Sequence, residues 1–362
     1  MKEIKVGIVT YGKVARLQAK AISKLDGVRL VAVQGRDEAK RVAFARDFDI
    51  MPCATVADLA KAGVDLAIVS SPHPLHRDQT IEALDAGIHV LVEKPMALST
   101  ADCDAMIGAA KRNGRRLGVI SQRRWFPAVR RVKEAIEDGK LGDTILADIV
   151  MYGWRDEAYY RSDPWRGSWS QEGGGVLVNQ APHQLDLLLW FMGPVAEVHA
   201  YWSNLNHPYI EVEDTAVAVL RFESGALGSI LVSNSQKPGI YAKVHVHGQN
   251  GATAGVQTDG GAMFVAGMSS IVEPAKNDIW TIPGEESFPG RWENEDLAFF
   301  KELEGQGIEA TDWYHARQIE DFATAIREGR EPSVDAMAGR ATVALFEAIY
   351  ESGRTGAAVK PR

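Results

Sequence analysis

Residues 5–15 read KVGIVTYGKVA, and this stretch decides the fold class. Lys5–Thr10 is a short apolar run rich in β-branched residues, which is typical of a strand buried on both faces. A turn containing Gly12 follows, and apolar residues then recur at the spacing of a helix. A buried strand, a glycine turn and a helix in this order predict the opening unit of a parallel α/β sheet.

The same alternation of apolar runs and helical patterns continues to about residue 122. Further strands are expected at Leu30–Val33, Leu66–Ser70, His89–Val92 and Arg116–Ile120, and helices at Glu38–Asp47, Gln79–Ala86 and Ala101–Lys111. Strands separated by helices of about ten residues predict a doubly wound parallel sheet of the Rossmann type. We therefore expect a first domain over residues 1–122.

The pattern changes after Gln122, where Gly, Asn and Pro turns separate most of the strand-like runs. Strands are expected at Ile145–Tyr152, Ala196–Trp202, Ala216–Phe222, Ala226–Ser233, Ala242–His247 and Gly261–Val265, and helices at Ala128–Glu137, His183–Phe191, Ala316–Glu328 and Val334–Ser352. Short turns favour antiparallel neighbours. Residues 123–362 are therefore expected to form a second α/β domain with a largely antiparallel sheet.

The composition excludes several classes of function. The chain has 40 Lys and Arg against 48 Asp and Glu, a net charge of −8, so it lacks the basic surface of a nucleic-acid binder and would be repelled by anionic membranes. Two cysteines cannot build a disulfide framework or a zinc site. His245 and His247 share one strand face, which we interpret as a half-exposed sheet surface and not as a metal site. With no targeting segment or long apolar run in view, we expect a cytoplasmic protein.

The turn after the first strand is a candidate phosphate-binding loop. A dinucleotide fingerprint requires G-x-G-x-x-G/A at this place, and here the turn reads Thr10-Tyr11-Gly12-Lys13-Val14-Ala15. Gly12 falls where the backbone must approach a pyrophosphate, and the following helix offers free N–H groups and a positive dipole end. Thr10 replaces the first glycine. The alternative is an ordinary strand–helix turn.

The end of the second strand bears on the choice of cofactor. A carboxylate for the adenosine ribose is expected about 20 residues after the fingerprint, but Gly35 stands there and Arg36 follows it. A guanidinium can bind a 2′-phosphate through two hydrogen bonds. This favours NADP over NAD. The alternative is that Asp37 binds the ribose of NAD and Arg36 is a solvated turn residue.

Two further segments carry candidate proton-transfer groups. Glu93-Lys94-Pro95 directly follows a predicted strand, at the sheet edge where doubly wound folds bind ligands, and Pro95 allows a cis bond. The triple glycine 173–175 precedes Asn179 and His183, which are four residues apart and would share a helix face. Histidine titrates near neutrality, which suits acid–base catalysis. A surface lysine and a core histidine are the alternatives.

These segments together give the chain a definite resemblance. The set comprises the fingerprint region, Ser71-Pro72-His73-Pro74-Leu75-His76, the stretch 86–95 (AGIHVLVEKP), Gly139-Lys140-Leu141-Gly142, the glycine–Asn–His segment, and the tail segments 318–322 and 348–352. In this order the motifs resemble the Gfo/Idh/MocA family, which is typified by glucose–fructose oxidoreductase and inositol dehydrogenase.

The resemblance implies a nicotinamide-dependent oxidoreductase whose C-terminal domain carries an open sheet that serves as the oligomer interface, as a homodimer or homotetramer. By position, Lys94 resembles the catalytic lysine and His183 the acid–base histidine of the family. The residues that the resemblance places at the cofactor are Ser71, Pro72, His73, His76, Glu93, Lys94, Trp165 and Arg166. The chain departs from the family at Thr10, and at Asn179 where many members carry Asp.

We predict that His183 is the principal base, that Lys94 positions the substrate hydroxyl, and that Asn179 orients the substrate or His183. Aromatic and arginine residues before the glycine run suit a sugar, glycoside or cyclitol ring, although core packing would also explain them. The candidates for contact with substrate are Lys94, Arg123, Tyr152, Arg155, Tyr160, Asn179 and His183, and Gln122 is a candidate for contact with the cofactor. The arginine pairs 123–124 and 130–131 otherwise look like a solvated helix face.

Two other functions remain open on the sequence. One is a glycoside-cleaving enzyme, in which a transient oxidation enables elimination and the cofactor is recycled. The other is a non-catalytic NADP-binding regulator, against which the presence of both Lys94 and His183 speaks.

Overall fold

The computed structural model describes residues 2–260 and 274–362, and the chain divides into two compact units. Met1–Gln122 and Thr311–Val343 form the first unit, and Arg123–Ala310 and Ala344–Arg362 form the second. The first boundary falls where the sequence pattern changes. Residues 311–343, which the sequence-based division placed in the second domain, cluster with the first unit instead. The strand expected at Gly261–Val265 lies outside the described residues.

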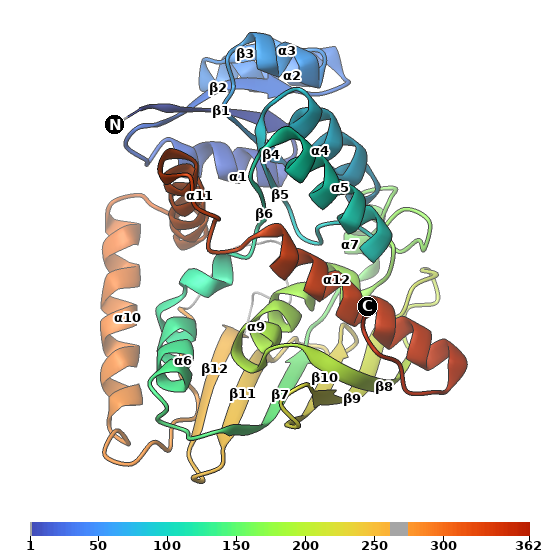
Figure 1. Ribbon diagram of the computed structural model, residues 1–362, viewed down its shortest axis with the longest axis vertical. Coiled ribbons are helices and arrows are strands. Elements are labelled where there is room, and N and C mark those ends of the chain that lie inside the picture. Colours follow the sequence, from blue (N-terminus) through green and yellow to red (C-terminus); the bar gives the residue numbers. More distant parts are fainter. Residues whose placement is uncertain (1, 261–273) are drawn as a thin grey trace. The chain divides into compact units, whose positions relative to one another are not determined.

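The first unit contains a six-stranded parallel sheet in the order β3-β2-β1-β4-β5-β6 (Figure 1). Its strands are β1 Ile4–Val9, β2 Val28–Gln34, β3 Met51–Cys53, β4 Leu66–Val69, β5 His89–Val92 and β6 Leu117–Val119. The central strands are apolar on both faces and almost fully buried, as the continuous apolar runs predicted. The doubly wound parallel sheet is confirmed.

Helices cover this sheet. They are α1 Lys13–Ile22, α2 Glu38–Phe48, α3 Val56–Lys61, η1 His73–Leu75, α4 His76–Asp85, α5 Thr100–Asn113 and α11 Ala310–Glu328. The last of these explains the revised boundary, because Ile319 and Phe322 lie in the same apolar core as Ile8 and Ile68. Gln318 also donates to the carbonyl oxygen of Val119 at 2.7 Å, which ties α11 to β6.

The second unit contains a six-stranded mixed sheet in the order β12-β11-β7-β10-β9-β8. Its strands are β7 Thr144–Tyr152, β8 Val195–Ser203, β9 Thr215–Phe222, β10 Leu227–Ser233, β11 Tyr241–Gly248 and β12 Thr253–Gly260. All neighbouring pairs are antiparallel except β7 and β10, which run parallel. The largely antiparallel sheet is therefore confirmed.

One face of this sheet is covered by helices and the other is open. The helices of the unit are η2 Gln122–Trp125, α6 Pro127–Glu137, α7 Glu157–Arg161, α8 Val176–Asn179, α9 Pro182–Met192, α10 Phe288–Gly305 and the end of α12 Ala336–Thr355. The apolar helix α9 packs on β7 and β11 (Figure 1). The opposite face exposes large apolar side chains, among them Tyr201, Val217, Val219 and Leu227.

The sequence did not predict β3, α3, α10 or β12. The strand β3 has only three residues and includes Pro52, which suits its place at the sheet edge. The strand β12 lacks large alternating apolar residues, so its pairing with β11 determines its structure. No helix among the described residues is long and apolar enough to cross a membrane.

Candidate active site

The candidate site in the first unit lies where the strand order reverses. From β1 the chain proceeds to β2 on one side and later to β4 on the other, so the crevice beyond the carboxyl ends of β1 and β4 is the switch point where such sheets bind ligands. Thr10 follows β1 and Ser71 follows β4. Glu93 and Lys94 follow the next strand, β5, and Gln122 follows β6 at the same edge.

Thr10 adopts the backbone geometry that favours glycine. Its φ angle is 98°, a region that β-branched residues rarely occupy, and its N–H donates to the carbonyl oxygen of Gln34 at 2.7 Å. Such a conformation costs on the order of 1–3 kcal/mol and persists because the surroundings hold it. The turn therefore keeps the shape of a glycine fingerprint although its first glycine is replaced.

The turn fits a dinucleotide. Gly12 is the N-cap residue of α1, so this helix start has no side-chain cap of its own, and its first turn carries no acidic residue. A Cβ atom built at Gly12 meets no atom within 4 Å, so the space above the backbone is open. The buried hydroxyl of Ser71 has no hydrogen-bond partner among the described residues. A helix start without a side-chain cap, an open cradle and an unsatisfied hydroxyl are suited to phosphate and ribose oxygens.

Substituting Gly12 by Ala should separate binding from folding. Because the Cβ has open space and φ is −72°, we expect the free energy of unfolding to change by less than about 1 kcal/mol. The methyl group would occupy the approach to a pyrophosphate, so dinucleotide affinity should fall by roughly tenfold or more. Calorimetric titration would measure the affinity, with Gly108→Ala on α5 as the control. Wild-type affinity in the Gly12 variant would contradict this assignment.

The ends of β1 and β2 are joined by Tyr11. Its ring covers Gly35, where a Cβ atom would lie 2.1 Å from a ring carbon, and its hydroxyl accepts the N–H of Asp37 at 3.1 Å. The carboxylate of Asp37 caps α2 by accepting the N–H of Lys40. Arg36 is exposed beside them. The carboxylate of Asp37 is thus hydrogen-bonded to the start of α2, while Arg36 is exposed to solvent.

His76 has a different position from that expected of a cofactor-lining residue. Its ring is fully buried, with Nδ1 at 2.8 Å from the carbonyl oxygen of Pro95 and Nε2 at 2.8 Å from that of Ser71. Burial lowers the pKa of this histidine. His76 therefore ties the turn after β4 to the turn after β5. His73 is also buried, with its ring 5.8 Å from that of His76.

Glu93 and Lys94 are held by groups from neighbouring elements. The Nε2 of Gln18, a buried residue of α1, donates to Glu93 Oε1 at 2.8 Å, and the N–H of Lys94 donates to Oε2 at 3.1 Å. Ser70 donates in turn to Gln18. Burial of the carboxyl group raises the pKa of Glu93 to about 7. The Lys94–Pro95 bond is cis, as the sequence allowed.

In the second unit, buried carboxyl groups fix the glycine run. Glu213 Oε2 accepts the N–H of Gly175 at 2.8 Å, and Oε1 accepts the N–H of Leu177 at 3.0 Å and the hydroxyl of Tyr350 at 2.9 Å. Burial raises the pKa of Glu213 to about 7. Gly174 has no room for a side chain, because a Cβ would lie 2.1 Å from the Tyr350 oxygen. These contacts place the start of α8.

Asn179 and His183, together with Gln180, are the partly exposed residues of an otherwise buried segment. Residues 174–178 and 184–188 are buried, whereas Asn179 and His183 remain partly exposed. The amide Nδ2 of Asn179 donates to Glu172 Oε1, and Glu172 is 1% exposed. Asn179 is the last residue of α8 and His183 lies in the first turn of α9, so the pair does not share one continuous helix face as the spacing predicted. The carboxylate of Glu172 contacts Asn179.

The aromatic segment before the glycine run forms a compact group. The guanidinium of Arg166 lies over the rings of Trp165, at 4.6 Å, and Tyr159, at 4.3 Å, and donates to the Tyr159 hydroxyl. Gln180, next to Asn179, donates to the same hydroxyl at 3.1 Å. The Arg155 guanidinium stands 5.2 Å from the Tyr159 ring centroid. Arg155 and Arg166 are thus grouped near α8.

Other predicted substrate residues are placed elsewhere in the second unit. Tyr160 is buried against His207, Tyr209 and Tyr159, which is a packing role. Tyr152 stacks on Tyr241 and alternates with the buried Met151, so it belongs to the sheet face away from α9. The structure does not bring these two residues together with Asn179 and His183.

The arginine pairs are not a solvated face. Arg123 donates to Thr258 and Asp259 on β12, and Arg124 is buried in a two-point ion pair with Asp186. Arg131 makes a similar pair with Asp296, although Arg130 is exposed. The sequence interpretation was wrong for Arg123, Arg124 and Arg131 because their acidic partners lie 62 or more positions away.

Matches to known proteins cover both units. A family model described as an oxidoreductase family with an NAD-binding Rossmann fold matches residues 4–121, and a GFO/IDH/MocA C-terminal domain model matches residues 129–254. Myo-inositol 2-dehydrogenase of Thermotoga maritima is 30% identical over 258 residues, which is 68% of this chain and 74% of that protein. The chain belongs to the Gfo/Idh/MocA family.

Two further members of this family bear on substrate class. WlbA dehydrogenase from Bordetella pertussis, solved in complex with NADH and UDP-GlcNAcA, is 30% identical with a TM-score of 0.85, and the match covers 99% of this chain and 98% of that chain. The 1,5-anhydro-D-fructose reductase of Ensifer adhaerens is 28% identical over 262 residues, 69% of this chain and 74% of that protein. The family is thus one of NAD-binding oxidoreductases. Its members that resemble this chain include enzymes named for sugar and cyclitol substrates.

Sequence reasoning missed three residues of this family member's site, which are Gln18, Glu172 and Glu213. Each acts through another residue, and the partners of Gln18 and Glu213 lie 36 to 137 positions away, which leaves no local pattern. Glu172 had a usable signal, because it directly precedes the glycine run that the sequence singled out.

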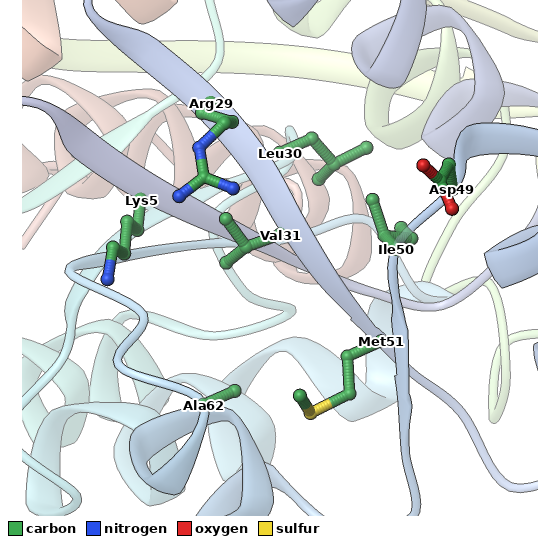
Figure 2. Close-up of a pocket in the computed structure, with 8 residues that line it drawn as sticks. All are labelled: Lys5, Arg29, Leu30, Val31, Asp49, Ile50, Met51 and Ala62. Carbon is green, nitrogen blue, oxygen red and sulfur yellow. The ribbon is translucent and has the colours of Figure 1, made fainter.

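A separate cavity of about 320 Å³ lies at the opposite edge of the first sheet (Figure 2). It is lined by Lys5, Arg29, Leu30, Val31, Asp49, Ile50, Met51 and Ala62. Except for Ala62, which ends α3, these residues lie in or just before β1, β2 and β3, whereas the fingerprint follows the end of β1. The cavity is therefore distinct from the nucleotide crevice. No three metal-ligating side chains come together in residues 2–260 and 274–362.

Proposed function

We propose that this chain is an NAD(P)-dependent oxidoreductase that acts on a ring hydroxyl or ketone of a sugar, glycoside or cyclitol. The observation that carries the proposal is the open cradle at Gly12 at the same sheet edge as the Glu93–Lys94 turn. The backbone N–H of Lys94 is held by the half-buried Glu93 at the nucleotide crevice, and a lysine at this turn is suited to orient a substrate oxygen beside a nicotinamide.

The residues that would hold the dinucleotide are those around the switch point. Thr10–Val14 would contact the pyrophosphate, Gly35 and Arg36 the adenosine ribose, and Ser71, Pro72 and Glu93 the nicotinamide half. Gln122, Trp165 and Arg166 are proposed as further contacts, and His76 supports the turns. When bound, the nicotinamide supplies hydride transfer to or from the carbon that bears the hydroxyl.

The protein's own groups would handle the proton. In the oxidation direction His183 takes the proton of the substrate hydroxyl while Lys94, as a cation, donates a hydrogen bond to the same oxygen and stabilises its developing negative charge. Asn179 orients the hydroxyl or His183.

The cofactor preference should depend on Arg36. It is exposed at the end of β2, and the nearby carboxylate of Asp37 is engaged as a helix cap. We expect NADP to be preferred, and Arg36→Ala to raise KM for NADP roughly tenfold with little change for NAD, because only NADP carries the 2′-phosphate. Initial rates with both cofactors would test this, with Lys40→Ala as a control cation. A preference for NAD that Arg36→Ala leaves unchanged would establish NAD as the cofactor.

The substrate class follows from the surroundings of α8. Arg155, Arg166, Trp165 and Tyr159 supply aromatic faces and cationic donors, which suit a polyhydroxylated ring. The chain's negative net charge disfavours a highly phosphorylated substrate. The Bordetella relative, in contrast, was solved with a nucleotide sugar. Both kinds of substrate therefore belong in the test.

The experiment is a panel of sugars, cyclitols and UDP-GlcNAcA with NADP and NAD, followed by absorbance of the reduced nicotinamide. Turnover with a ring alcohol supports the proposal. Release of free aglycone from a glycoside without net change in nicotinamide would show the glycoside-cleaving alternative instead. Binding of NADP without turnover on any member of the panel would support a regulator.

We also propose that the open sheet face is a homo-oligomer interface. Leu146, Val217, Val219 and Leu227 are 42–58% exposed there and Tyr201 is 70% exposed. Adjacent apolar residues on an open sheet commonly mark an association surface. We expect light scattering to show a dimer or tetramer, and Val219→Lys to shift it toward monomers. A wild-type monomer at high concentration would contradict this.

A further inference from the structure

Glu172 has the environment of a functional carboxylate. It is 1% exposed, Oε2 accepts the N–H of Gly167 at 2.5 Å, and Oε1 accepts the amide Nδ2 of Asn179. Both oxygens are thus used, and one of them holds a residue of the proposed active site. Hydrogen bonds from neutral donors stabilise the ionised form of a buried carboxyl group.

The backbone around Glu172 fixes this contact. Gly167 and Gly173 have φ angles of 75° and 86°, which favour glycine, and a Cβ at Gly167 would lie 2.7 Å from Ile210. The N–H groups of Glu172 and Gly173 donate to the carbonyl oxygen of Ser168. These contacts hold the turn in the conformation that brings the carboxylate to Asn179 at the end of α8.

This contact determines which way the Asn179 amide faces. A carboxylate accepts hydrogen bonds and an amide carbonyl cannot donate one, so Nδ2 must face Glu172. The Oδ1 atom then remains as the acceptor on the other side of the amide. An acceptor at this position can bind the hydroxyl of a substrate, or the N–H of His183 four residues later in the chain.

We propose that Glu172 is a positioning residue that sets the orientation of Asn179. Through Asn179, it also supplies the negative charge of the acid–base site. The proposal rests on the oxidoreductase function and deepens it. It assigns the site a substrate that presents a hydroxyl donor to Asn179, and it makes Glu172 and Asn179 a single unit.

The carboxylate and the amide of this pair can exchange positions without loss of hydrogen bonds. In the double variant Glu172→Gln with Asn179→Asp, the Gln oxygen can accept from Gly167 and its Nε2 can donate to the new carboxylate. In Asn179→Asp alone, two carboxylates would face each other and share a proton. In Glu172→Gln alone, the Asn179 amide must turn over so that its Oδ1 accepts from the Gln Nε2, and a donor then faces the substrate where the acceptor was. We therefore expect each single change to be harmful and the double change to restore function.

The experiment is a double-mutant cycle measured on the full chain. We expect each single variant to lower kcat about tenfold or more, with KM for the dinucleotide unchanged, and Asn179→Asp to gain an ionisation in its profile between about pH 5 and about pH 9. The double variant should recover to within about threefold of wild type and lose that ionisation. Chemical unfolding of the same four proteins needs no substrate and should show the same non-additive pattern.

The possible outcomes distinguish a failure of the Glu172–Asn179 pairing from a failure of the oxidoreductase function. If both cycles are additive in an active wild-type enzyme, the pairing is overturned and the oxidoreductase function stands. If unfolding is coupled but kcat and its pH profile are not, Glu172 is structural only and the proposal is overturned. If the wild type turns over no substrate in the panel, the oxidoreductase function fails, and this proposal fails with it whatever the unfolding cycle shows.

Discussion

Lys94→Ala and His183→Ala should each lower turnover by a factor on the order of 10² or more while leaving dinucleotide binding intact. Loss of a general acid or base removes this much because proton transfer then depends on solvent. Loss of Lys94 also removes the cation that stabilises charge on the reacting oxygen. Steady-state kinetics with the substrate found in the panel, together with calorimetric titration of the dinucleotide, would measure both effects.

A lysine outside the site provides the comparison for this pair of variants. Lys111 is exposed on α5, and Lys111→Ala should keep turnover within about twofold of wild type. Melting temperatures of all three variants show whether a lost rate reflects unfolding. Near wild-type rates for either site variant would remove that residue from the mechanism.

Gly175→Ala is expected to be the most destabilising single change. A Cβ at Gly175 would lie 1.7 Å from the carbonyl oxygen of Glu213, an atom of the buried backbone that cannot move aside like a flexible side chain. Relief requires α8 to shift and the Gly175 hydrogen bond to Glu213 to break. We expect a loss of about 3 kcal/mol or more in the free energy of unfolding, measured by urea titration.

The matched control is Gly305→Ala at the end of α10, in the same unit. A Cβ there meets no atom within 4 Å, and alanine is the better helix former. It should be neutral or stabilising by up to about 1 kcal/mol. If Gly175→Ala unfolded at the same urea concentration as this control, the packing described around Glu213 would be incorrect.

The architecture was predictable where burial alone determines structure. The central strands of the first sheet are apolar on both faces, so the sequence placed them within one or two residues, whereas it missed the exposed edge strand β3. Helix α11 was placed on the chain but assigned to the wrong unit, because a helix with one apolar face does not show which sheet it covers. Its contacts with Ile8 and Ile68 join residues more than 200 positions apart.

The site was predictable only for residues within recognisable local patterns. Gly12, Lys94, Asn179 and His183 lie in short motifs, and the structure places each on an accessible turn or helix end. Their supporting groups are found only in three dimensions. The buried position of His76 depends on carbonyl oxygens in the turns after β4 and β5, which no spacing rule encodes.

The measurement that tests the central claim most directly is a crystal structure of the protein with a dinucleotide and its ring substrate bound. The account predicts that Lys94 Nζ and a ring nitrogen of His183 both lie within about 3.2 Å of one substrate oxygen, with the carbon that bears it against the nicotinamide. Should the ammonium group and the imidazole face different cavities, with no shared substrate atom between them, the account would be contradicted.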